Sequence, residues 1–203
     1  MATFTELCND VYTITSRPDL VAETKLAVKA ATLKLHQVDY WYKDINEAAI
    51  QFTAADYTQQ VELKSIFPLF RSLSYLRRFS LDSSNTSSGG EAKEFYKIIT
   101  PDNVVDSYRI DKVNVAYMAG IVCNIKSKEL LQYALVGYYA LPNVTEAAFY
   151  SWIADDHPYA IIFEAARLLF KQIGFDEQSA TFEKLALEQV AELKISNTQA
   201  VGY

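Results

Sequence analysis

The chain has 203 residues, of which half are hydrophobic and 22% are charged, so it can form a packed core and is not expected to be globally disordered. Its formal net charge of −6 argues against tight electrostatic binding to a phosphate backbone. The most apolar run, residues 133–142, is too short to span a bilayer, and we expect neither a signal peptide nor a membrane contact. Two distant cysteines indicate reduced thiols in a protein made in the cytoplasm.

The first part of the chain has the pattern of helices. Thr3 and Glu6 have the spacing of a capping box, and apolar residues then recur at helical intervals. Pro18 interrupts this pattern because the residue before a proline is pushed out of the helical region. Asp19 is expected to cap a second helix that runs to about Leu35. A short third helix is expected over residues 44–52.

The middle of the chain has the pattern of strands. A polar segment, residues 82–91, is rich in Ser and Gly and is expected to be a loop. Short apolar and aromatic runs with turn signals between them predict a small antiparallel sandwich or barrel. The expected extended segments are residues 57–66, 69–80, 96–99, 106–110, 113–119, 121–125 and 130–139.

Helical patterns return after Pro142. Thr145 is expected to cap a helix over residues 146–153, and Pro158 begins the clearest helix of the chain, which should stop at Gly174. Asp176 begins the last helix. The final residues, 195–203, carry no charge and no periodicity, and we expect an extended tail.

The order of these segments predicts an α+β protein. Residues 1–56 and 145–194 would form one discontinuous helical bundle, residues 57–144 an inserted β module, and residues 195–203 the tail. This is the most economical arrangement because both ends of the chain are helical and the strands are contiguous.

No residue pattern in the sequence indicates catalysis. The sequence contains no GxSxG, CxxC, GxGxxG or GK[ST] motif, and its histidines are His36 and His157. Asp155, Asp156 and His157 could be imagined as metal ligands, but acidic residues at a helix N-terminus are ordinarily caps. We therefore expect no enzyme activity, no catalytic residue, no cofactor and no metal.

One basic cluster is compatible with two functions. Arg71, Arg77 and Arg78 alternate with aromatic and apolar residues. Arginines among aromatics can neutralise and stack on nucleic acid. The same spacing also fits a strand with one buried face, and a structural or subunit-contact function is the preferred interpretation.

Several stretches of the sequence resemble the head-to-tail adaptor proteins of short-tailed bacteriophages, also called neck, connector or head-completion proteins. The similarity covers most of the chain and consists of apolar, aromatic and turn residues. The stretches that carry it are residues 4–12 (FTELCNDVY), 17–20 (RPDL), 67–77 (FPLFRSLSYLR), 115–120 (VAYMAG), 137–139 (GYY) and 165–174 (AARLLFKQIG).

The resemblance implies a structural virion protein that forms a ring, typically twelvefold, beneath the portal protein. Such a ring extends the DNA channel without gripping the double-stranded DNA and offers a platform for tail proteins. On this reading, Ile195, Val201 and Tyr203 are candidates for docking on the portal or on a neighbouring subunit. Arg71, Arg77 and Arg78 are candidates for subunit or channel contacts. The alternatives are another virion assembly protein, such as a tail-completion or minor head protein, and a nucleic-acid-binding module that uses the three arginines.

Overall fold

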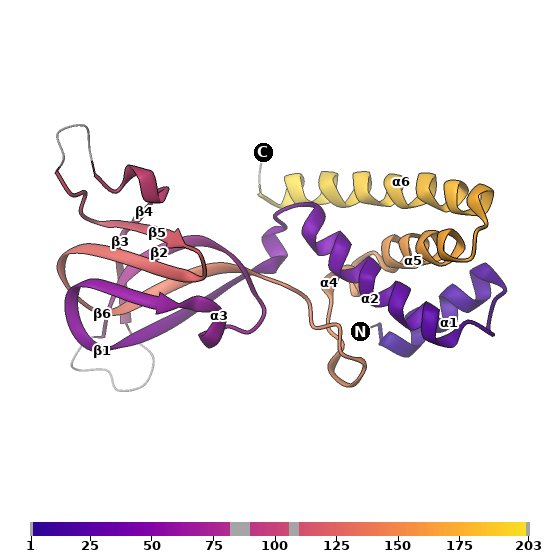
Figure 1. The fold of residues 1–203 in the computed structure, drawn as a ribbon, viewed down its shortest axis with the longest axis horizontal. Coiled ribbons are helices and arrows are strands. Elements are labelled where there is room, and N and C mark those ends of the chain that lie inside the picture. Colours follow the sequence, from indigo (N-terminus) through magenta and orange to yellow (C-terminus); the bar gives the residue numbers. More distant parts are fainter. Residues whose placement is uncertain (1, 82–89, 106–109, 202–203) are drawn as a thin grey trace. The chain divides into compact units, whose positions relative to one another are not determined.

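The computed structural model describes residues 2–81, 90–105 and 110–201 and is a mixed helix and sheet fold, as the sequence predicts (Figure 1). The chain divides into two compact units. The helical unit comprises the residues up to Asp44 and those from Leu141 onward, and the β unit comprises Ile45–Ala140. The β unit is therefore an insertion, and it begins earlier than the expected residue 57.

The helical unit opens with the predicted capping box. Helix α1, Phe4–Thr15, begins after Thr3, whose hydroxyl oxygen accepts from the backbone N–H of Glu6 at 3.2 Å. The Glu6 carboxylate accepts in return from the backbone N–H of Thr3 at 2.7 Å. Two free N–H groups of the first turn are thereby satisfied by one pair of side chains.

Helix α2, Val21–Val38, does not begin as the sequence predicted. Its N-cap residue is Leu20, and the expected cap, Asp19, is engaged by Arg17 through two hydrogen bonds of 2.9 and 2.8 Å. The bidentate guanidinium–carboxylate pair satisfies the Asp19 oxygens. The capping prediction for Asp19 was therefore wrong.

The expected helix over residues 146–153 is also wrong. The structure has one short 3-10 turn, η3, over Glu146–Ala148, and then helix α4, Trp152–Asp156, which Ser151 caps. Glu146 is drawn to α2, where its carboxylate accepts from Lys25 at 2.8 Å and from Lys29 at 3.1 Å. These tertiary contacts compete with continuation of a helix.

The last two helices run antiparallel to each other as a hairpin (Figure 1). Helix α5, Pro158–Gln172, starts at the predicted proline and ends before Gly174, which has φ +81°. Helix α6 extends over Asp176–Val201, so the expected extended tail is helical up to residue 201. No glycine or proline lies between Asp176 and Gly202, and the Asn197 side chain accepts a hydrogen bond at 3.0 Å from the backbone N–H of Tyr42. Packing and propensity thus both extend the helix.

The core of the helical unit lies where the apolar stripes of α1, α2 and α5 meet. Each fully buried large aliphatic side chain stabilises the fold by roughly 1.5–3 kcal/mol. Buried side chains on these three helices include Leu7, Val11, Val28, Leu35, Ile161, Ile162 and Leu169. Helix α6 contributes fewer buried residues, and its exposed fraction is correspondingly high.

The β unit is a nearly closed, barrel-like sheet organised around one long strand. Strand β6, Val122–Ala140, pairs antiparallel with β1, Ile45–Glu62, and over its two halves also with β5, Val115–Ala119, and β2, Phe70–Leu81. Strand β3, Gly90–Phe95, pairs with β2, and β4, Lys97–Ile98, pairs with β5. Tyr96 joins β3 to β4, and its N–H donates to the Leu76 carbonyl at 2.8 Å.

Strand β1 replaces the helix that was expected over residues 44–52. Ile50 and Phe52 are buried and alternate with exposed residues, which is the period of a strand. Pairing with β6 from Ile45 opposite Tyr139 to Gln51 opposite Tyr133 supplies the backbone hydrogen bonds. The apolar residues of this segment fit the period of a helix or that of a strand, and pairing with β6 selects the strand.

The other strand predictions hold with shifted limits. The expected segment 57–66 is strand to Glu62 and then a short helix, α3, over Leu63–Ile66. The segments 121–125 and 130–139 are parts of the single strand β6. Residues 82–89 and 106–109 lie outside the described residues, so the expected loop and one expected strand fall largely there. Within the described part of the chain, no helix combines the length and apolar character that a bilayer span requires.

Candidate functional site

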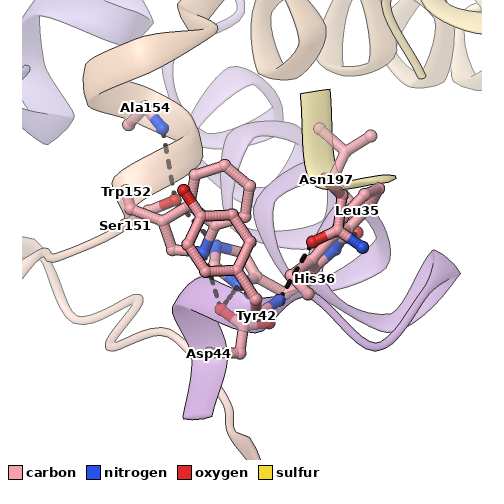
Figure 2. Close-up of polar contacts among 9 residues, drawn as sticks. Leu35, His36, Tyr42, Asp44, Ser151, Trp152, Ala154 and Asn197 are labelled. Carbon is pink, nitrogen blue, oxygen red and sulfur yellow. Dashed lines mark hydrogen bonds and ion pairs between the residues drawn. The ribbon is translucent and has the colours of Figure 1, made fainter. Parts of the chain in front are cut away.

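A buried polar cluster lies in the helical unit around the 3-10 turn η1, Tyr42–Asp44, which directly precedes β1 (Figure 2). His36 of α2 places its Nδ1 2.8 Å from Oδ1 and 3.1 Å from Oδ2 of Asp44. Its Nε2 lies 2.9 Å from the hydroxyl oxygen of Ser151. The exposed fractions of these residues are 2% for His36, 5% for Asp44 and 3% for Ser151.

The hydrogen bonds of this cluster are mutually consistent. The Asp44 carboxylate accepts from His36 Nδ1–H and, at 2.7 Å, from the indole N–H of Trp152. Nε2 of His36 and the Ser151 hydroxyl form the second hydrogen bond of the imidazole, and the Ser151 oxygen also accepts at 3.3 Å from the backbone N–H of Ala154. Figure 2 shows these side chains pointing toward one another from α2, η1 and the start of α4. Such a buried network favours a single arrangement, because the loss of any member leaves another buried polar group without a hydrogen bond.

The order Asp44–His36–Ser151 has the connectivity of a hydrolase triad. A nucleophile must, however, reach a substrate carbonyl, and the Ser151 hydroxyl is buried and bonded to both His36 and the first turn of α4. Trp152 packs edge-on against the His36 ring, with centroids 5.8 Å apart. In this conformation the three residues position backbone segments and do not present a nucleophile to solvent.

The three residues before Asp44 add further tethers. The indole N–H of Trp41 donates to the Leu35 carbonyl at 2.9 Å, and Trp41 is fully buried. Lys43 pairs with Asp156 at 2.5 Å and lies 5.2 Å from the Trp152 ring centroid. Together with Tyr42, which donates to Asn197, these contacts connect residues 41–44 to α2, α4 and α6. The cluster therefore fixes the chain where it leaves the helical unit.

The prediction that Asp155 and Asp156 cap α5 is wrong. The N-cap residue of α5 is His157. Asp155 accepts from the backbone N–H of Ala2 at 2.7 Å, and Asp156 pairs with Lys43. Both acidic residues therefore make tertiary contacts. Among the described residues, no three His, Cys, Asp or Glu side chains are grouped so that they could hold a metal ion.

The three arginines lie on β2 but do not form one basic surface. Arg78 pairs with Glu129, and the Arg77 guanidinium lies 4.4 Å from the centroid of the Phe95 ring. Since consecutive residues of a strand face opposite sides, Arg77 and Arg78 point away from each other. Arg71 lines a separate apolar groove. The arrangement does not favour a continuous phosphate-binding stripe.

The expected docking residues fall at the end of α6. Ile195 is 59% exposed, and Leu187, two turns earlier, is 63% exposed. Ala191 lies exposed between them, and spacings of four residues place all three along one side of the helix, with Leu187 also bordering a groove formed with α2 and α5. Val201 is the last residue of α6, and its side chain and Tyr203 lie outside the described residues.

The His36–Asp44–Ser151 cluster was not predicted from the sequence. Its members come from three segments, and His36 and Ser151 are 115 positions apart in the chain. The available signal was a lone histidine on the inner face of a helix, which is ordinarily a core residue. No family model matches this chain, and no curated protein matches it either.

Proposed function

We propose that this chain is a non-enzymatic assembly subunit, specifically the adaptor that binds as a ring beneath the portal in the neck of a tailed-phage virion. The resemblance of residues 4–20, 67–77 and 165–174 to such adaptors motivates the specific form of the proposal. The subunit is made in the bacterial cytoplasm and becomes part of the virion. Its ring extends the DNA channel and carries the tail proteins.

The observation that carries the proposal is the apolar outer stripe of α6, formed by Leu187, Ala191 and Ile195. Large aliphatic side chains that are 63% and 59% exposed and lie two turns apart leave apolar surface in contact with water. Exposed apolar residues aligned along one side of a helix are candidates for protein–protein contact. Leu187 also borders a groove that α6 forms with Leu35 and Val38 of α2, so the surface proposed for docking extends from this groove along α6 to Ile195.

The charges of the helical unit are compatible with a channel wall. Helix α6 carries five acidic and two basic side chains, so it repels a phosphate backbone. A wall that repels DNA lets the duplex pass without being held. The contacts among many copies of one subunit add up around a ring, because each bound copy raises the effective concentration of the next contact.

The test is the mass of the purified chain measured by light scattering, alone and after mixing with the portal protein of the same virus. We expect a discrete, saturating complex with the portal ring. The variant Leu187→Glu/Ile195→Glu should lose this complex while keeping its helical circular dichroism. Gln178→Glu, a charge added to an exposed position near the start of α6, is the matched control.

Two outcomes would count against the proposal. If no complex forms at any salt concentration, the chain is not a portal adaptor. If the double variant binds as well as the control, the outer stripe of α6 is not the docking surface, and the main support for an assembly function is lost.

A further inference from the structure

We draw no further inference here: the strongest candidate, the groove that α6 forms with α2 and α5 in the helical unit, belongs to the docking surface already described, and because its cations Lys34 and Arg167 are both bonded to the buried Glu164 carboxylate, nothing in the structure shows what covers it.

Discussion

His36 and Asp44 form a nearly solvent-free pair in which Nδ1 of the imidazole lies 2.8 Å from a carboxylate oxygen. The pair is the centre of the cluster that also holds Ser151 and Trp152. Asp44, the last residue before the β unit, is thus bonded to helix α2 and to the first residue of α4. We expect Asp44 to contribute more to the stability of the fold than an exposed acidic residue does.

Replacing Asp44 by Ala should therefore destabilise the helical unit by about 2–5 kcal/mol, since the buried N–H groups of His36 and Trp152 both lose their acceptor. Urea unfolding followed by far-ultraviolet circular dichroism measures the change. Asp10→Ala, at an exposed position of α1, is the control and should change stability by less than about 0.5 kcal/mol. A midpoint for Asp44→Ala equal to that of the control would show that the cluster does not stabilise the fold.

Glu164 of α5 should make the folded chain less stable at acid pH. Burial raises the pKa of its carboxyl, but hydrogen bonds from Arg167 and Lys34 outweigh that effect and leave the pKa below its ordinary value of 4.5. A lowered folded-state pKa means that the stabilisation is complete above the unfolded value and is lost as pH falls through the folded one. The stability difference between the native chain and Glu164→Gln should be largest near neutral pH and should shrink below about pH 4.5. A difference that is independent of pH contradicts the assignment.

Gly137 of β6 should tolerate no side chain while Tyr75 is present. A Cβ at this position would lie 2.3 Å from the Tyr75 ring of the paired strand. We expect Gly137→Ala to cost about 1–3 kcal/mol, the usual range for overpacking. In a Tyr75→Ala background the same change should cost nearly nothing, so a double-mutant cycle measures the contact directly. If the changes in the free energy of unfolding caused by the two substitutions are additive, the Tyr75 ring does not restrict the side chain at position 137.

Both cysteines should react slowly in the folded protein. Burial raises the pKa of the Cys8 and Cys123 thiols to about 11. At pH 8 about 0.1% of such a thiol is ionised, and only the thiolate reacts. Ellman's reagent should label both residues rapidly in denaturant and at least a hundredfold more slowly without it. Fast native labelling would show that one of the thiols becomes exposed.

Asn197 should hold the end of α6 against η1. Its side-chain oxygen accepts from the Tyr42 N–H at 3.0 Å. Asn197→Ala should increase hydrogen exchange at the Tyr42 amide and cost about 1 kcal/mol. Thr198→Ala, at the next residue, which is exposed, is the matched control. It should leave the Tyr42 amide protected from hydrogen exchange. Unchanged exchange in Asn197→Ala would contradict the tether.

Local sequence signals predicted those elements whose ends depend on near neighbours. The Thr3–Glu6 capping box and the Pro158 start of α5 are set within a few residues, and both predictions were confirmed. Residues 45–52 were misassigned because their apolar spacing fits a helix or a strand, and β6, more than eighty residues later, decides the outcome.

The same limit applies to the site. Asp19 looked like a cap, but the Arg17 side chain engages it, and Asp155 and Asp156 bond to Ala2 and Lys43. Nothing near His36 in the sequence indicates Ser151 as its partner. Such contacts arise from tertiary packing and leave no periodic pattern in one sequence.

The division of the helical unit between the two ends of the chain dictates an order of folding. Every strand pair of the β unit is available once Ala140 has been synthesised, because that unit is one continuous segment. The apolar faces of α1 and α2 must wait for α5, whose contacts with them span more than a hundred residues. Helical proteins usually fold fast because their contacts are local, but here they are not. The sheet should therefore form first, while the apolar faces of the first two helices stay without their α5 partner until residues 158–172 have been synthesised.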